Sequence, residues 1–514
     1  MLSVLRNRTY RRLFGAQVVA LSGTGLATVA LSLLAYDLAG ADAAAVLGTA
    51  LAIKMAAYVG LAPVVSALAD RVPRRALLVA MDLARAAVAL SLPFVTRVWQ
   101  VYVLILLLQA ASAAFTPAFQ ATIPRVLPDE REYTEALSLS RLAYDLESLA
   151  SPVLAAALLT VVPYAWLFTG TAAGFLASAL LVHTTTLPGP PEPAPPGDAP
   201  VRDARVRGGR ARRAYGKVAF GTRLLLATPR LRALLALDLA VAAAGAVVLV
   251  GTVLLVRDTL GRAAGDVPLA LGAYGAGSMA VALLLPRVLG RAEDRAVMVR
   301  AAFVLPGALG MLAVGLAVPS GAWSWPALLV LWAVVGAAGS AVLTPGGRVV
   351  RRSAGSGDLP AAFAARFSLS HACWLVTYPL AGWLAVRSGP AVAAAVLAAV
   401  ALLGAVGAAR LWPRTDPVEL PHVHPELPAG HPHLAGSAGP HAHDFHIDAL
   451  HRHWPKAGAP AAPGASAPAP SASGPRASGP SGPGPSSGRP ASGRSWSGQR
   501  VRRISRPSRT TSRP

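Results

Sequence analysis

Apolar runs long enough to cross a lipid bilayer constrain this chain more than any other feature of its sequence. A helix of roughly 20 apolar residues spans the hydrocarbon core, and about twelve such runs occur here. The chain is 54% hydrophobic and 14% charged, whereas a soluble domain has about 25% charged residues. An ordinary soluble enzyme is therefore excluded. We expect membrane-spanning helices at 12–36, 43–66, 75–96, 98–120, 135–160, 162–182, 230–256, 267–289, 296–318, 324–345, 360–386 and 389–411.

These runs divide six and six around a polar insert, an arrangement typical of chains built from two related halves. We expect an all-α integral membrane protein with twelve transmembrane helices in two six-helix pseudo-symmetric halves, followed by a disordered C-terminal tail. The expected parts are an N-terminal half at 1–182, a cytoplasmic linker at 183–229, a C-terminal half at 230–411, a histidine-rich metal-binding tail at 412–455 and a disordered Pro/Ser/Gly/Ala/Arg tail at 456–514.

Positive charge is unevenly distributed between the connections. Lys and Arg gather before the first run and in the even-numbered connections, while the others hold only Arg97, Arg257, Arg262 and Arg387. This predicts cytoplasmic N- and C-termini, and we expect a monomeric multi-pass protein in a bacterial cell (inner) membrane. Because the net charge of +23 follows this topology, nucleic acid is not an expected partner. The only cysteine, Cys373, cannot form an intrachain disulfide.

Nine of the eleven histidines fall between His422 and His453. Eight of them form four His-x-His pairs, which are His422/His424, His431/His433, His441/His443 and His451/His453, and the ninth is His446. In an extended segment residues i and i+2 point the same way, so each pair can present two imidazoles to one cation. Imidazole suits Ni, Co, Zn and Cu, and Glu419, Glu426, Asp444 and Asp448 offer oxygen atoms nearby. The alternative is a tail of drifted composition without a selected role.

A polar stripe is expected along the first membrane helix. Gln17, Thr24, Thr28, Ser32 and Tyr36 fall within roughly 80° of one another on a helical wheel. Such a stripe can line a wet central cavity. In the alternative interpretation, each hydroxyl merely bonds to its own helix.

Ionisable residues inside the membrane are costly, so each is a candidate site residue. In the fifth span Arg141 and Asp145 can pair at a spacing of four, while Glu147 faces another direction. Both carboxylates lie near the expected bilayer midplane, where coupling ions bind in transporters. His371, deep in the eleventh span, could exchange protons or bind a divalent cation. A structural role for these residues is the alternative.

The connection at 66–78 resembles the loop signature G-x-L-a-D-r-x-G-r-k-x-x-l of the major facilitator superfamily, found between the second and third helices. The matching positions are Leu68, Asp70, Arg71, Arg74, Arg75 and Leu78, while Ser66 and Pro73 replace two glycines. The resemblance implies a cytoplasmic charge cluster, formed by Asp70, Arg71 and Arg74 with Arg75, that locks the outward-open state.

Within that superfamily, the stretch 115–121 is similar to the siderophore and drug exporter branch. The segments 33–40 and 133–145, together with the histidine-rich tail, resemble nickel-resistance exporters. The resemblance implies a secondary active antiporter that exports a divalent transition metal, nickel first and cobalt second, by proton-coupled alternating access. No Walker-type nucleotide motif is present, so ATP-driven transport is not expected.

We do not expect enzymatic activity or a required cofactor, although the tail is expected to bind a transition-metal ion. Two other functions fit the same residues. The substrate could be a drug or a metal chelate, with the tail as a regulator. Alternatively, the chain could be a membrane-tethered metal sensor or buffer.

Overall fold

The computed structural model describes most of the helical part of the chain and short stretches after it. Residues 1–462 form one compact unit, and all of the described residues lie within it. The described residues are 2–39, 46, 49–50, 52–61, 72–187, 210–263, 266–319, 321–417, 419–424, 427, 432–434, 441–448, 450–451 and 453–455.

The first group of helices, called here the N-terminal group, precedes residue 184. Its elements are η1 (Leu2–Arg6), α1 (Arg8–Ala39), α3 (Arg74–Ser91), η3 (Leu92–Phe94), α4 (Val98–Val126), α5 (Glu130–Leu159) and α6 (Ala165–His183). Helix α1 packs against α5 and α6, and α3 packs against α4 and α6. At the start of α5 the Asp129 side chain accepts a hydrogen bond from the Glu132 amide at 2.9 Å, which satisfies an otherwise unpaired amide.

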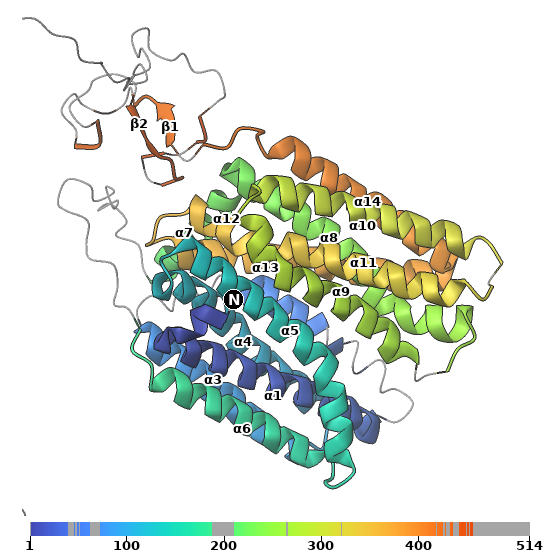
Figure 1. The fold of residues 1–514 in the computed structure, drawn as a ribbon. Coiled ribbons are helices and arrows are strands. Elements are labelled where there is room, and N and C mark those ends of the chain that lie inside the picture. The colour runs from blue at the N-terminus through green and yellow to red at the C-terminus, as the bar shows by residue number, and fades with distance from the viewer. Residues whose placement is uncertain are drawn as a thin grey trace, which may run out of the picture. The chain divides into compact units, whose positions relative to one another are not determined.

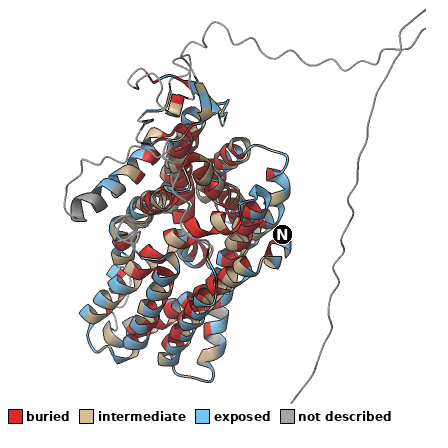
Figure 2. Ribbon diagram, turned by 90° about the vertical axis from the view of Figure 1, so that its left-hand side faces the viewer, coloured by how far each residue is buried: buried red, intermediate tan, exposed pale blue. Residues whose placement is uncertain are grey.

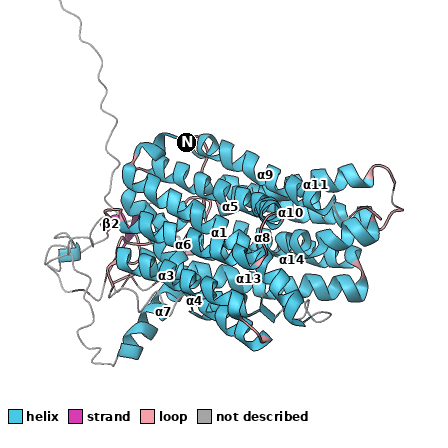
Figure 3. Cartoon of the chain, turned by 90° about the horizontal axis from the view of Figure 1, so that it is seen from below, coloured by secondary structure: helices cyan, strands magenta, loops and turns pink. Residues whose placement is uncertain are grey.

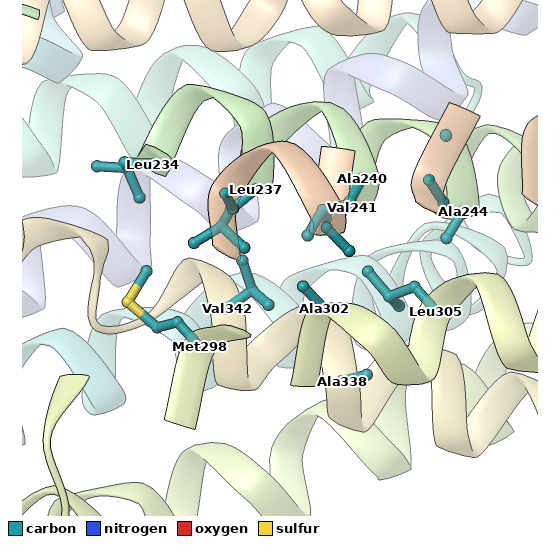
Figure 4. Close-up of a cluster of buried hydrophobic side chains, with 14 of the residues drawn as sticks. Leu234, Leu237, Ala240, Val241, Ala244, Met298, Ala302, Leu305, Ala338 and Val342 are labelled. Carbon is teal, nitrogen blue, oxygen red and sulfur yellow. The ribbon is translucent and has the colours of Figure 1, made fainter. Parts of the chain in front are cut away.

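The remaining helices make up the C-terminal group. They are α7 (Arg210–Ala227), α8 (Pro229–Leu254), the π-helical turn η4 (Leu255–Thr259), α9 (Asp266–Leu289), α10 (Asp294–Leu316), α11 (Ser324–Leu343), α12 (Gly346–Ser353), α13 (Leu359–Ser388) and α14 (Pro390–Leu411). Helix α8 lies at the centre of this group and contacts α10, α13 and α14. Figure 4 shows how its apolar side chains meet those of α10 and α11 in a buried core.

Two glycines allow α9 and α11 to approach closely. A Cβ atom on Gly277 would overlap the backbone of Ala333, and one on Gly336 would overlap the backbone of Tyr274. Small residues at helix contacts bring backbones together in membranes, where no hydrophobic force drives helices to associate. This pair of helices is therefore the tightest contact described in the C-terminal group.

The two groups meet along two helix pairs. Helix α5 contacts α9, and α4 contacts α13. Figure 1 shows the blue-to-green N-terminal group beside the green-to-orange C-terminal group, with α5 and α9 between them. Residues on these four helices are therefore placed at the boundary between the groups.

Within the described residues, ten helices are long and apolar enough to cross a membrane. The expected number of twelve is not confirmed. The fifth expected span is the 30-residue helix α5, which is not among the ten. The second coincides partly with the shorter apolar helix Ala52–Leu61, and most of its other residues lie outside the described part of the chain. Figure 2 shows exposed residues on outward-facing helix surfaces, and on α4 these include Trp99 and Leu107, which suit contact with lipid.

The only strands among the described residues follow α14, as Figure 3 shows. Strands β1 (Glu419–His422) and β2 (His441–Asp444) pair antiparallel, and His422 lies opposite His441. Between them lies the short turn η5 (Pro432–Leu434). From the sequence we expected an extended metal-binding segment here, but not that two parts of it pair as strands. The ribbon forms because the two pairing segments are short and extended, and one face of each carries side chains that pack together.

Candidate functional site

The β-ribbon and the turns after it gather histidines from all four pairs. His422 and His424 are buried, and His441 and His443 point to the same face of β2 because side chains alternate along a strand. We call the described residues 419–455 the histidine module.

The Nε2 atoms of five histidines form a continuous chain of close approaches. His422 lies 3.0 Å from His451, which lies 3.2 Å from His424. His424 lies 3.1 Å from His433, and His433 lies 3.3 Å from His443. One group of four ligand nitrogens, from His422, His433, His443 and His451, lies entirely within 4.8 Å. The pairs thus contribute to one shared centre rather than to separate sites.

Three of these rings are oriented by an acceptor at Nδ1. The partners are the Leu420 carbonyl at 2.8 Å for His422, the Asp444 carbonyl at 2.8 Å for His443 and the Asp448 carboxylate at 3.0 Å for His451. Because a carbonyl can only accept, Nδ1 must carry the proton in the first two. The lone pair is then on Nε2 and faces the centre. This is the arrangement by which metal-binding histidines are held in proteins.

The donor set fits a small transition-metal ion. With metal–nitrogen bonds of about 2.0–2.1 Å, the nitrogens of a tetrahedral site lie roughly 3.3–3.4 Å apart. Two pairs of the group are close to this value, His422 with His451 at 3.0 Å and His433 with His443 at 3.3 Å, and all four nitrogens lie within 4.8 Å of one another. Burial, followed by neighbouring histidines, lowers the pKa of His433 to about 4. Burial likewise lowers the pKa of His422 to about 4. Both rings are then neutral at pH 7, as a metal ligand must be.

The other expected ligands are placed differently. His441 joins a second group with His422, His424 and His433. His446 and His453 belong to neither group, and His453 is exposed. His431 and Glu426 lie outside the described residues. Among the carboxylates, Glu419 and Asp444 are exposed on the ribbon, and Asp448 holds His451 instead of joining either group.

The predicted polar stripe of α1 is only partly involved in contacts between helices. The Gln17 side chain accepts a hydrogen bond from Ser140 of α5 at 3.0 Å. Thr24 and Thr28 are exposed, but their hydroxyls donate to the carbonyls of Ala20 and Thr24 in their own helix. The side chains of residues 32 and 36 lie outside the described residues. For the two threonines the structure agrees with the alternative interpretation of bonding within the helix.

Arg141 and Asp145 pair as their spacing predicts, and they also reach the C-terminal group. Arg141 Nη2 lies 2.9 Å from Asp145 Oδ1. Ser278 of α9 donates to Asp145 Oδ2 at 2.6 Å and accepts from Arg141 at 2.9 Å. The sequence analysis missed Ser278, because a serine in an apolar helix often bonds only to its own backbone. The three side chains form a buried polar link between α5 and α9.

Glu147 and His371 make separate contacts near this boundary. Glu147 accepts a hydrogen bond from Ser151 and interacts electrostatically with Lys54 of the helix Ala52–Leu61. The His371 ring lies 4.8 Å from the Tyr58 ring, and its Nδ1 is 2.7 Å from the Phe367 carbonyl. Lys54 and Tyr58 both belong to the helix Ala52–Leu61, so Glu147 and His371 lie near the same helix.

The predicted gate residues are described only in part. Asp70 and Arg71 lie outside the described residues. Arg74 donates to the Ala121 carbonyl at 3.4 Å, and Arg75 is exposed.

At the same end of the helices, Arg348 of α12 links the two groups. Arg348 lies 2.7 Å from Glu130 of α5 and 3.2 Å from Asp294 of α10. It also donates to the Thr134 hydroxyl at 2.6 Å. We call this set of contacts the Arg348 bridge. The sequence analysis missed it, because its partners are more than 50 residues away from Arg348 along the chain.

Residues 13–321 match the family described as Major Facilitator Superfamily. The chain belongs to this superfamily. It is a multi-pass membrane transporter, and family and fold point to transport rather than to enzymatic catalysis. The predicted superfamily is thereby confirmed, whereas similarity to nickel exporters remains a prediction.

Known proteins resemble this transporter in part of the sequence or in fold. The "Uncharacterized MFS-type transporter YfiS" of Bacillus subtilis (strain 168) is 28% identical over 122 residues, or 24% of this chain and 29% of that protein. The match thus spans less than a third of the relative's length. The human organic anion transporter MFSD10 superposes with a TM-score of 0.61 and 14% identity, covering 78% of this chain and 99% of that one. The E. coli fucose:proton symporter FucP gives 0.59 and 13%, covering 79% and 98%. At these identities the two structures show the fold alone.

In this transporter the candidate residues fall into two places. The membrane set, around Arg141, Asp145 and Glu147, lies near the boundary between the two helix groups. The histidine centre lies after the last helix, in the module.

Proposed function

We propose that this protein is a secondary transporter that exports a divalent transition-metal cation, nickel first and cobalt second, in exchange for protons. The observation that carries the proposal is the convergence of histidine Nε2 atoms, four of them within 4.8 Å of one another. Such a nitrogen site captures nickel, cobalt, zinc or copper far better than magnesium or calcium. In this proposal, the histidine module collects the ion on the cytoplasmic side.

We assign the path of the ion through the membrane to residues at the boundary between the N-terminal and C-terminal groups of helices. Asp145 forms an ion pair with Arg141, and Glu147 interacts electrostatically with Lys54. A divalent ion that entered here would compete with those cations for the carboxylates. Protons returning through the same site would neutralise the carboxylates and release the metal, which is the simplest way to couple the two movements. The polar link through Ser278 would open whenever the groups separate.

The orientation supports export from the cytoplasm. Lys and Arg are concentrated at one end of the helices, the end that the positive-inside rule assigns to the cytoplasm. Both termini are then cytoplasmic, in the cell (inner) membrane of a bacterium. A module on this side can load an exporter.

Transport into inverted membrane vesicles tests the proposal. With an acidic, positive vesicle lumen, so that the proton-motive force is directed outwards, nickel should accumulate inside vesicles that contain the protein. Asp145→Asn and Glu147→Gln should each reduce this accumulation to the level of empty vesicles. The matched control is Glu132→Gln, an exposed carboxylate on the same helix, which should transport normally. Undiminished nickel transport by both membrane variants would refute the assigned path.

A second candidate substrate is an organic anion or an anionic metal chelate. It is favoured by the positive side chains Lys54 and Arg366 and by the aromatic rings of Tyr58 and Phe367 around His371. Cationic groups attract an anion and repel a bare cation, and aromatic rings can stack on a planar organic group. Vesicles offered free nickel or a preformed nickel–citrate complex distinguish the two, because only the transported form accumulates.

A third candidate, a metal sensor or buffer without transport, predicts no accumulation in either form. Metal tolerance in cells would then depend on the histidine module alone. The vesicle experiment therefore separates all three functions.

A further inference from the structure

The histidine module is seated on the C-terminal group through an apolar face. Phe445 and Ile447 are almost fully buried, and Leu420 and Trp454 pack with them. All four belong to the same hydrophobic cluster as the core residues of α8, α10 and α14. The module thus shares its apolar layer with the membrane body.

Polar anchors surround this apolar layer. Asp416, just before the module, lies 3.1 Å from Arg230 and 2.7 Å from Arg352. The Arg230 side chain is 2% exposed, and its guanidinium stacks over the Trp454 ring at 5.3 Å. Arg223 of α7 donates to the backbone carbonyl of Asp448 at 3.1 Å. Helices α7 and α8 therefore contact the module directly, and α8 and α12 hold Asp416 just before it.

The residues that seat the module also touch the histidine centre. The Phe445 ring lies 5.0 Å from His422, 4.6 Å from His451 and 5.2 Å from Trp454. Asp448 binds His451 through its side chain and Arg223 through its carbonyl. A shift of His422 or His451 must therefore also move Phe445 and Asp448, through which the module contacts the C-terminal group.

The anchors connect further to the contact between the two helix groups. Arg352 and Ser353 of α12 hold Asp416 and Arg230. Arg348 lies one turn earlier on the same short helix and forms the Arg348 bridge to Glu130 of the other group. A helix of eight residues moves as a rigid piece, so its two ends are mechanically linked.

We infer that metal binding to the histidine centre locks the module onto Arg223 and Arg230 and thereby stabilises the Arg348 bridge. The inference rests on the proposed metal capture and adds regulation to it. Without a cation, the Nε2 lone pairs of His422 and His451 face one another at 3.0 Å, which disfavours the seated arrangement. A cation removes this repulsion and fixes ligands from separate stretches of chain. Metal at about 100 times its Kd can shift the ratio of seated to released module by up to about 100-fold.

The experiment uses the full chain in nanodiscs, with Cys373→Ala providing a background without cysteine. Spin labels on Glu132→Cys and Gly357→Cys, both exposed, report the separation of the two groups beside the Arg348 bridge. Zn²⁺ is the probe because it is diamagnetic, and calorimetry measures its binding independently. We expect one tight equivalent of Zn²⁺, and we expect the short-distance population of the labels to grow.

Arg223→Ala is the decisive variant, because this exposed side chain anchors the module without belonging to the histidine centre. It should bind Zn²⁺ within about threefold of the parent but lose most of the distance response. Arg232→Ala, also exposed and 9 positions later, should respond like the parent.

Two results would overturn the inference. A full distance response in Arg223→Ala, or unchanged distances in the parent despite bound Zn²⁺, would refute the coupling and leave metal capture standing. Absence of Zn²⁺ binding would refute both the coupling and the proposed metal capture.

Discussion

Asp448 orients His451, which is one of the four histidines whose ligand nitrogens lie within 4.8 Å of one another. Its Oδ1 accepts from the His451 amide at 2.6 Å, the Leu450 amide at 2.8 Å and the His451 ring at 3.0 Å. Burial would raise the pKa of this carboxyl, but the hydrogen bonds from His451 and Leu450 outweigh it and lower the pKa below its usual value. The carboxylate is therefore charged near neutral pH and keeps the His451 Nε2 lone pair aimed at the centre.

We predict that Asp448→Asn weakens metal binding by about 10- to 100-fold, as expected for loss of a residue that orients a ligand. Calorimetric titration of the purified protein with Zn²⁺ measures the effect. Glu419→Gln, an exposed carboxylate on β1, is the control and should bind normally. Equal affinities for the two variants would contradict the prediction.

The lowered pKa of His422 and His433 also predicts a pH dependence of the metal-free module. Each pKa falls from 6.5 to about 4 on folding, so between these values the unfolded module binds more protons. Stability must then decrease as pH falls from about 6.5 towards 4. Hydrogen exchange of residues 441–448 at pH 7 and pH 5, without metal, should show faster exchange at pH 5 after correction for the intrinsic rate. Unchanged protection would contradict it.

For single residues, the sequence predicts contacts within one helix or strand, but it does not predict contacts between residues of different elements. The spacing of four between Arg141 and Asp145 predicted their contact. Ser278 could not be predicted, because its distance from Asp145 depends on how α5 and α9 pack. The His-x-His spacing predicted that imidazoles share a face, but one common centre depends on the pairing of β1 with β2.

Among the elements, long apolar helices are the most predictable because about 20 residues must cross the hydrocarbon core. Most of the helices lie within a few residues of the expected runs. Helices α7 and α12 were not predicted, since their sequences are rich in arginine and contain no apolar run of about 20 residues. Both owe their place to packing against α8 and α13.

Helix α12 gives a prediction about the contact between the groups. Arg348→Ala removes the ionic contacts to Glu130 and Asp294, leaving the buried Asp294 carboxylate without this partner. We expect the spin-label distances at Glu132→Cys and Gly357→Cys to lengthen even with bound Zn²⁺. Arg300→Ala, on exposed α10 surface, is the control. Unaltered distances in Arg348→Ala would show that the bridge does not hold the groups together.

The close contact of α9 and α11 gives another prediction, which concerns the stability of the protein. Gly336→Val would drive side-chain carbon into the Tyr274 backbone, so the helices must separate and lose packing. We expect a clear fall in folded yield and a melting temperature lower by several degrees, since roughly 1 to 3 kcal/mol is typical of overpacking. Gly310→Val, where no atom lies within 4 Å, is the matched control. Equal melting temperatures for the two variants would contradict this interpretation.

At the scale of the whole molecule, an ion pair that composition does not reveal joins the helical body to the tail that follows it. From the sequence we expected the tail at 412–455 to bind metal, yet its residue Asp416 also neutralises Arg230, which is 2% exposed within the body. A chain that ends at Arg414 should therefore unfold more easily, by about 3 to 5 kcal/mol, because a buried charge loses its partner. A chain that ends at Val418 keeps Asp416 and should retain the stability of the body and, in part, metal tolerance. Thermal unfolding in detergent and growth on nickel compare the two chains, and equal stability would contradict the assignment.

The Arg230–Asp416 pair also imposes an order on synthesis. The two residues are 186 positions apart, and at about 5 to 20 residues per second the ribosome needs roughly 10 to 40 s to travel from one to the other. During this interval Arg230 stands at the start of α8 without its carboxylate, so water or lipid phosphate must solvate it. Final burial of the guanidinium is consequently a late event that follows insertion of α14. Completion of the membrane body is thus postponed until the ribosome has begun the tail.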